Sequence, residues 1–216
     1  MPHPSTTPLE IARKQLLSAA TGWTPQQEIC GVSNALGRVL ATEQISSVDL
    51  PQTDNVAVDG YAVEAAFLAA HPDHLFKVAG TARAGHPFAG TAAPGEAVRV
   101  FTGAVMPEGP DCVIMHEDCQ ISDVGIICGK QLKSGTNMRP AGENIAAGET
   151  LAAKGVFLGA ADIGQLAAAG LSQIPVFQPL KIALMSTGDE LVQSGDSRKV
   201  GQISDSNRPM LAALCH

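Results

Sequence analysis

Apolar residues recur with helical spacing near the start of the chain. Between Leu9 and Ala20 they fall every three or four positions and share one face of a predicted helix. The sequence Thr7-Pro8-Leu9-Glu10 supplies an N-cap hydroxyl, a proline at the first helical position and a glutamate three residues after the cap. We therefore expect the helix to start there and to end at Gly22.

The same spacing predicts three further helices. A short helix should run from about Asn34 to Ala41 after the capping Ser33. A longer helix should occupy residues 159–169, with Gly170 as its C-terminal cap. The last helix should begin at Ser206.

The pattern changes between these helices. From about Phe76 to Glu149, short apolar runs alternate with Gly and Pro, which is typical of strands joined by turns. The predicted strands of this β module are residues 76–79, 97–101, 112–115 and 125–128. A further buried strand is predicted over Lys181 to Met185.

The final predicted strand and helix form an incomplete unit, because only Pro209 to His216 follow the start of the helix. A doubly wound sheet needs several strand-loop-helix units to cover both of its faces. We therefore expect the sequence to be truncated within such a domain.

Composition narrows the class of protein. Of 216 residues, 45% are hydrophobic but only 4% aromatic, so small aliphatic side chains should fill a globular core. The net charge of −7 argues against non-specific nucleic-acid binding, which depends on Lys and Arg. No apolar run approaches the roughly 18 to 20 residues that span a bilayer, and the start Met1-Pro2-His3-Pro4 lacks the basic and apolar regions of a signal peptide. We expect a cytoplasmic protein with no nucleic-acid or membrane partner.

The five cysteines are odd in number and contain no C-x-x-C pair. Neither a disulfide framework nor a zinc site is indicated, and buried or incidental thiols are the ordinary interpretation. The six histidines lack metal-ligand spacing, so none is assigned chemistry.

Two acidic turns carry the candidate chemistry. Asp54-Asn55-Val56-Ala57-Val58-Asp59-Gly60 places two acids, an amide and a glycine between apolar residues. Ser186-Thr187-Gly188-Asp189-Glu190 follows the predicted strand, where a loop at the carboxyl end of a parallel strand meets a ligand crevice. Two carboxylate turns far apart in sequence suggest a shared site.

Three further motifs join these turns, and together they carry a family resemblance. The motifs are Arg99-Val100-Phe101-Thr102-Gly103-Ala104, Met138-Arg139-Pro140-Ala141-Gly142-Glu143-Asn144 and Gly201-Gln202-Ile203-Ser204-Asp205-Ser206-Asn207. With the two turns, in this order and at this spacing, the chain from about Leu36 onward resembles the molybdopterin molybdenumtransferases, the enzymes that complete molybdenum cofactor.

The resemblance implies an α+β, multidomain fold. An elongated helical segment would contain an inserted small β module and be followed by the truncated start of a mononucleotide-type α/β domain. The implied parts are an N-terminal helical segment over 1–50, the β module over 51–146, a helical return segment over 147–177 and the first strand-loop-helix of a molybdopterin-binding domain over 178–216. The rest of the family's usual chain would lie beyond that point.

The family's reaction inserts molybdate into adenylylated molybdopterin and releases AMP, with help from Mg²⁺. Mg²⁺ prefers oxygen ligands, commonly one or two carboxylates with phosphate and water. The resemblance implies Asp59 and Glu190 as the metal ligands. An ordinary alternative for Asp59 is an Asp-Gly turn in which the carboxylate caps its own backbone and Gly60 has a positive φ. For Glu190 and Asp189 the alternative is a pair of first-turn acids that complement a helix dipole.

The resemblance also implies that Thr102 and Arg139 act in catalysis. The Thr102 hydroxyl would face the ligand, although Thr102-Gly103 also fits a turn that ends a strand. The Arg139 guanidinium would bind an oxyanion, although an arginine in such a loop is ordinarily solvated.

Further residues are implied in substrate binding. Ser186, Thr187, Gly188 and Asp189 offer hydroxyl, N–H and carboxylate groups at a strand end. Asp205 and Asn207 would line the same crevice as Glu190, but Asp205-Ser206-Asn207 also fits a simple helix cap.

The chain departs from the family pattern at two positions. The family usually has Gly-Glu-Asp where this chain has Gly142-Glu143-Asn144, and the amide removes a negative charge. Ser204 stands where many relatives have tyrosine. The first change puts metal or pterin handling at that loop in doubt.

These observations leave three functions open. The first is the transferase, expected as a homodimer with its site between chains, and with molybdopterin adenylyltransferase and molybdoenzyme maturation proteins as further partners. The second is a non-catalytic module for dimerisation or molybdopterin binding. The third, weaker reading is a phosphate-ester hydrolase that uses the two carboxylate turns.

Overall fold

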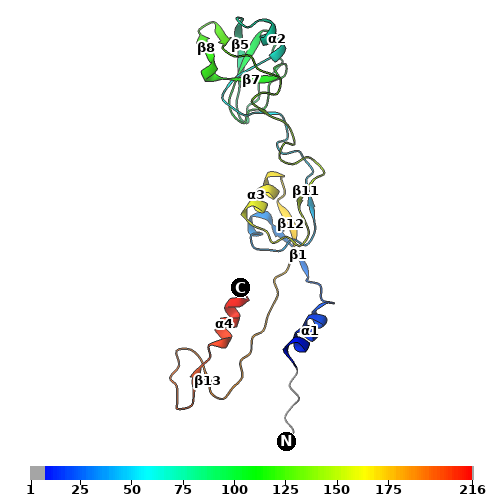
Figure 1. The fold of residues 1–216 in the computed structure, drawn as a ribbon, viewed down its shortest axis with the longest axis vertical. Helices are drawn as coiled ribbons and strands as arrows, with labels where there is room; N and C mark the ends of the chain where they lie inside the picture. The colour runs from blue at the N-terminus through cyan, green and yellow to red at the C-terminus, as the bar shows by residue number, and fades with distance from the viewer. Residues whose placement is uncertain (1–7, 216) are drawn as a thin grey trace. The chain divides into compact units, whose positions relative to one another are not determined.

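The computed structural model describes residues 8–215 (Figure 1). These residues fall into two units. One unit contains residues 28–176. The other contains the described residues of the segments 1–27 and 177–216. Mixed α and β structure with few helices confirms the broad fold class, and its finer description needs the corrections given below.

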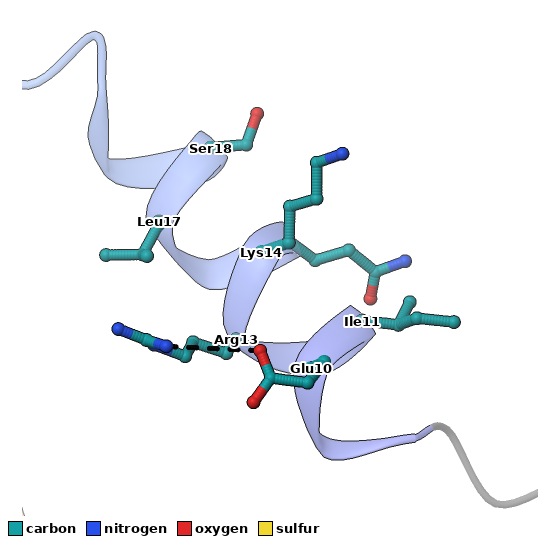
Figure 2. A pocket seen from close by; sticks show the side chains of 7 residues that line it. Glu10, Ile11, Arg13, Lys14, Leu17 and Ser18 are labelled. Carbon is teal, nitrogen blue, oxygen red and sulfur yellow. Dashed lines mark ion pairs between the residues drawn. The ribbon is translucent and has the colours of Figure 1, made fainter.

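The first helix, α1, spans Leu9–Ala20, as predicted. Pro8 stands just before it, and the predicted capping Thr7 lies outside the described residues. None of the residues of α1 is buried, so Leu9 and Leu16 of its predicted apolar face are exposed. Ile11 and Leu17, on other sides of the helix, are exposed as well. Figure 2 shows these two side chains together with the Glu10–Arg13 ion pair, whose charged atoms are 3.9 Å apart. A hollow of about 870 Å³ beside them is lined by residues of α1 alone. Because no second element encloses this hollow, we assign it no functional role.

In the larger unit, a first hydrophobic core is built from the segments that precede and follow the β module. Strand β1 (Gln27–Gly31) pairs with β12 (Gln173–Phe177), and β2 (Gln44–Ile45) pairs with β11 (Thr150–Ala152). The short 3-10 helix η1 (Val32–Asn34) also belongs to this region. Large buried members of this core are Leu40, Leu158, Leu166, Ile174 and Val176.

The predicted helix over 34–41 is wrong. The segment is extended after η1: the Leu40 N–H donates to the Val156 carbonyl at 2.9 Å, and Leu40 forms a bridge with Val176. Gly37 has a φ of 75°, which interrupts helical geometry. Residues 28–50 therefore contain short strands and one 3-10 turn, and the expected elongated helical segment is only partly helical.

The predicted helix over 159–169 is confirmed as α3 (Ala160–Ala168). Asp162 Oδ2 accepts a hydrogen bond from the Gly159 N–H at 2.8 Å, which satisfies a free donor at the start of the helix. Gly170 follows with a φ of 82°, as expected of a C-terminal glycine cap.

A six-stranded sheet forms the β module, in the order β7-β4-β6-β5-β9-β8. Figure 1 shows α2, β5, β7 and β8 grouped together. The predicted strands are confirmed as β5, β6, β7 and β9, whereas the sequence reading missed β4, β8 and the short helix α2. The bounds are β4 Gly60–Val63, α2 Ala65–Ala70, β5 Leu75–Ala82, β6 Glu96–Val100, β7 Cys112–Met115, β8 Cys119–Ser122 and β9 Gly125–Cys128, with the 3-10 helix η2 over His116–Asp118.

The sheet buries both of its faces. Along β4, Tyr61 and Val63 enter one hydrophobic cluster while Ala62 enters another, because successive strand residues point to opposite faces. Gly60 starts this strand where a Cβ atom would lie only 1.9 Å from the Ile114 carbonyl oxygen of β7. Close backbone approach therefore requires glycine here, and Gly60 is not among the glycines with positive φ.

Two aspartate side chains hydrogen-bond to loops that adjoin the β module. Strand β3 (Asn55–Val56) pairs antiparallel with β10 (Met138–Arg139). Asp54 Oδ1 accepts from the Ala141 N–H at 2.8 Å, and Asp49 Oδ1 accepts from the Ala147 N–H at 2.8 Å. These carboxylates hold chain segments that are far apart in sequence.

The predicted strand over Lys181 to Met185 is wrong. These residues have no strand pairing among the described residues and are mostly exposed. The unit instead contains a two-residue parallel pair, β13 (Leu191–Val192) with β14 (Ile203–Ser204), followed by α4 (Asn207–Leu214), which confirms the last predicted helix. No described helix is long and apolar enough to cross a membrane.

Candidate functional site

Asp59 and Thr102 meet at one end of the six-stranded sheet. Asp59 precedes β4 and Thr102 follows β6, and the antiparallel register of these strands pairs Gly60 with Val100. Asp59 Oδ1 accepts hydrogen bonds from both the N–H and the hydroxyl of Thr102, each at 2.8 Å. Both residues are exposed. The carboxylate is thus oriented at the surface by Thr102 and does not cap its own backbone.

Arg99 and His116 both favour the ionised form of this carboxylate. The Arg99 guanidinium lies 4.9 Å from the Tyr61 ring centroid and 5.3 Å from that of Phe101, and its Nη1 donates to the Tyr61 hydroxyl at 2.7 Å. His116 donates its backbone N–H to the Asp59 carbonyl at 3.1 Å. Arg99 Nε and His116 Nδ1 are buried without a hydrogen-bond partner among the described residues.

These contacts lower the pKa of Asp59. The largest cause is the hydrogen bond from the Thr102 backbone N–H, followed by the one from its hydroxyl, with smaller contributions from the Arg99 and His116 charges. Each contact favours the ionised carboxylate. Both hydrogen bonds use Oδ1, and the described residues direct no hydrogen bond at Oδ2. The site therefore presents an ionised oxygen to solvent.

Arg139 is held within its own loop. Its Nε donates to Glu143 Oε2 at 2.6 Å, and its Nη2 donates to Asn144 Oδ1 at 3.0 Å. The Asn144 amide thus keeps the hydrogen bond that a carboxylate would accept at this position, without its charge. Arg139 is half exposed and forms an ion pair with Glu143. The interpretation of Arg139 as an ordinary solvated arginine is therefore incomplete.

A second group of predicted residues meets in the other unit. Asp205 is buried, and its Oδ2 accepts from the Ser186 hydroxyl at 2.5 Å while its Oδ1 accepts from the Arg208 N–H at 3.1 Å. The Ser186 hydrogen bond is the largest cause of a lowered Asp205 pKa. A hollow of about 240 Å³ beside them is also lined by Thr187 and Asn207. Asp205 therefore both caps α4 and anchors the Ser186 loop.

Gly188, Asp189 and Glu190 occupy the exposed turn before β13. The Glu190 carboxylate lies against Gly188, where an added Cβ would come within 2.5 Å of Oε2. Gly188 has a φ of 152°, which also favours glycine. Glu190 stands at a turn before a short strand and does not begin a helix, so the first-turn explanation of Asp189 and Glu190 is wrong.

Within each unit, the structure brings some of the predicted site residues together. Asp59 contacts Thr102, and Ser186 contacts Asp205. Asp59 and Glu190 belong to different units, so their shared site stays a prediction. The sequence analysis missed Arg99 as a neighbour of Asp59. Arg99 stands three residues before Thr102 and two before Phe101, on a strand whose side chains alternate between the two faces of the sheet. His116 was missed because its approach depends on the β4–β7 pairing.

The donor set at Asp59 fits Mg²⁺ of the kind that enters with a phosphorylated substrate. Such an ion needs only one or two protein carboxylates, because phosphate and water supply the other oxygens. Asp59 offers one ionised carboxylate with Oδ2 available. No group of three or more His, Cys, Asp or Glu side chains within residues 8–215 could hold a metal alone.

The chain is similar to proteins that share one name. A molybdopterin molybdenumtransferase from Haemophilus influenzae is 36% identical over 201 residues, covering 93% of this chain and 49% of that protein. One from Nostoc is 39% identical over 191 residues, covering 87% and 44%. The chain thus spans about half the length of the curated relatives it matches.

Solved structures and a family model agree with these relatives. A crystal structure of a molybdopterin biosynthesis MoeA protein from Pyrococcus horikoshii has a TM-score of 0.83 and 33% identity, and the match covers 98% of this chain and 54% of that one. The model of the MoeA N-terminal region, domains I and II, matches residues 7–170. The chain belongs to the MoeA N-terminal region family.

Proposed function

We propose that this chain acts in molybdenum cofactor biosynthesis as part of a molybdopterin molybdenumtransferase. The reaction would insert molybdate into adenylylated molybdopterin and release AMP. The observation that carries the proposal is the Asp59 carboxylate, which Thr102 orients at the surface with Oδ2 available. The names of the relatives support a transfer of molybdenum to molybdopterin.

Each site residue has a proposed task. Asp59 and Glu190 would hold Mg²⁺, which supplies charge neutralisation at phosphate when it is bound. Thr102 keeps the Asp59 carboxylate ionised and fixed, while Arg139 contributes a guanidinium for an oxyanion. Ser186, Thr187, Gly188 and Asp189 would bind the substrate together with Asp205 and Asn207. The enzyme would work in the cytoplasm as a homodimer, with molybdopterin adenylyltransferase and molybdoenzyme maturation proteins as partners.

A non-catalytic molybdopterin-binding or dimerisation module remains the second candidate. The observation in its favour is the neutral Asn144, which leaves the Arg139 loop with one carboxylate, Glu143, instead of two. Such a module would bind adenylylated molybdopterin without consuming it.

Turnover separates the two candidates. The protein would be isolated at its native length and supplied with adenylylated molybdopterin, molybdate and Mg²⁺, and released AMP would be measured. The transferase should release AMP only when molybdate and Mg²⁺ are both present. Substrate binding without AMP release would support the non-catalytic module. AMP release that does not depend on molybdate would support a phosphate-ester hydrolase.

A further inference from the structure

Two cysteines lie directly opposite each other in the β8–β9 hairpin. The antiparallel register pairs Cys119 with Cys128, and the hairpin closes at Ser122 and Gly125. The Gly129 N–H donates to the Asp118 carbonyl at 2.9 Å, so Asp118 and Gly129 form a hydrogen-bonded pair. Because such pairs alternate along an antiparallel ladder, Cys119 and Cys128 occupy the adjacent non-hydrogen-bonded pair.

This position suits a covalent bridge. Opposed residues of a non-hydrogen-bonded pair have Cα atoms about 4.5 Å apart, and disulfides accept Cα separations of about 4.4 to 6.8 Å. Both sulfurs lie on one face of the hairpin, since opposed side chains point the same way. A bridge therefore needs no change of register.

The two thiols differ in environment. Cys128 is only 5% exposed, whereas Cys119 is half buried. A hydrogen bond from the Cys128 thiol is the largest cause of a lowered Cys119 pKa, and the Arg99 charge also lowers it, whereas burial and the Asp118 and Glu117 charges oppose the shift. The same hydrogen bond is the largest cause of a raised Cys128 pKa, and burial adds to it. Cys119 is the more exposed thiol and the one with the lower pKa, so it is the nucleophile of the pair.

We propose that Cys119 and Cys128 form a peroxide-sensitive thiol pair that closes into a cross-strand disulfide. The Cys119 thiolate attacks one oxygen of hydrogen peroxide, the O–O bond breaks, and hydroxide leaves to take up a proton as water. The resulting Cys119 sulfenic acid is attacked by the Cys128 sulfur, which forms the S–S bond and releases a second water. Two thiols are oxidised by two electrons, and peroxide is the oxidant that is reduced.

Closure would fix one wall of a charged groove. A groove of about 480 Å³ is lined by hairpin residues 121–126 together with residues that include Tyr61, Lys77 and Arg99. The disulfide lies at the open end of the same hairpin, so it restrains both of its strands. This inference is independent of the proposed transferase activity, because it concerns the thiols of the β module alone.

Peptide mapping tests the linkage directly. The reduced protein would be treated with hydrogen peroxide, alkylated without reductant and cleaved before aspartate. Cleavage before Asp111, Asp118 and Asp123 places Cys112, Cys119 and Cys128 on three separate peptides. The proposal predicts that peptide 118–122 becomes joined to the peptide that begins at Asp123, with loss of two hydrogens.

Cys112 provides the internal control. It is buried, donates to the Val63 carbonyl, and burial raises the pKa of its thiol to about 12. Its peptide should stay unlinked, and Cys112→Ser should leave the Cys119–Cys128 linkage unchanged. Cys112 oxidised ahead of Cys119, or Cys119 and Cys128 alkylated as free thiols after peroxide treatment, would overturn the proposal.

A sulfenic-acid trap tests the order of events without requiring the bridge. In Cys128→Ser, dimedone should label the 118–122 peptide, because the sulfenic acid has no partner thiol to condense with. In Cys119→Ser, labelling of Cys128 should fall at least tenfold below that level. Equal labelling in the two variants would contradict Cys119 as the reacting thiol.

Discussion

At the scale of single residues, the position of Asp59 depends on a contact across 43 positions of sequence. Asp59 alone resembles any aspartate before a glycine, and local rules favour a self-capped turn. The sheet changes this outcome, because antiparallel pairing of β4 with β6 brings the Thr102 N–H and hydroxyl to the same carboxylate oxygen. The Gly60 position is then explained by β7 packing and not by a turn.

Removing the Thr102 hydroxyl should raise the pKa of Asp59. In Thr102→Val one of the two hydrogen bonds to the ionised form is lost, while the backbone N–H still donates. Carboxyl ¹³C chemical shifts measured against pH should show a titration of Asp59 below the usual 3.8 in the original protein and at higher pH in the variant. Thr91→Val, which removes an exposed hydroxyl elsewhere, should leave the titration of Asp59 unchanged.

The direction in which the stability of the fold changes with pH follows from the lowered pKa of Asp59. Asp59 binds its proton less tightly in the folded state than in the unfolded state, so its contact with Thr102 stabilises the fold above about pH 4 and is lost as pH falls through the folded pKa. An Asp59 pKa that is identical in the original protein and in Thr102→Val would contradict the assigned hydrogen bond.

At the scale of elements, the sequence patterns predicted the helices and strands whose stability depends mainly on local features. Helix α3 combines helical spacing, Asp162 at its start and Gly170 at its end, and all three agree. The segment 34–41 has similar spacing, but pairing of Leu40 with Val156 and Val176 overrides it. Tertiary contacts of this kind are not visible in helical periodicity.

Two glycines should respond oppositely to alanine. Gly60→Ala places a Cβ 1.9 Å from the Ile114 carbonyl oxygen, so β4 and β7 must separate. We expect the free energy of unfolding to fall by about 1 to 3 kcal/mol or more, as for other overpacked sites. The measurement is equilibrium urea denaturation followed by circular dichroism.

Gly164→Ala in α3 is the matched control for this substitution. Apart from the adjacent backbone of the helix, no atom lies within 4 Å of the added Cβ, and alanine favours helix, so stability should rise by up to about 1 kcal/mol. A Gly60→Ala variant as stable as the original protein would show that β4 does not approach β7 as closely as described.

At the scale of the whole molecule, the chain divides into two units, and among residues 8–215 the well-buried cores lie in the larger one. The β module was predictable because short apolar runs and turn residues mark β5, β6, β7 and β9. Its strand order was not, since β5 and β6 are parallel and β9 pairs with β5. The strand predicted over residues 181–185 was wrong because a strand needs a neighbour, which these residues lack among the described residues.

Limited proteolysis should distinguish residues 178–190 of the smaller unit from the sheet of the larger unit. Residues 178–190 have no helix or strand, and Lys181 is exposed. Trypsin should therefore cut at Lys181 while Lys77 in β5 and Arg99 in β6 remain intact. Mass spectrometry of the early fragments would show this order, and early cleavage within β5 or β6 would contradict the described sheet.

The central claim is that Asp59 is a functional carboxylate, and AMP release tests it most directly. The protein at native length would be compared as the original, Asp59→Asn and Asp73→Asn, the last an exposed control in the same module. With adenylylated molybdopterin, molybdate and Mg²⁺ supplied, Asp59→Asn should lose molybdate-dependent AMP release while Asp73→Asn keeps it. Unchanged AMP release by a folded Asp59→Asn protein would contradict the account.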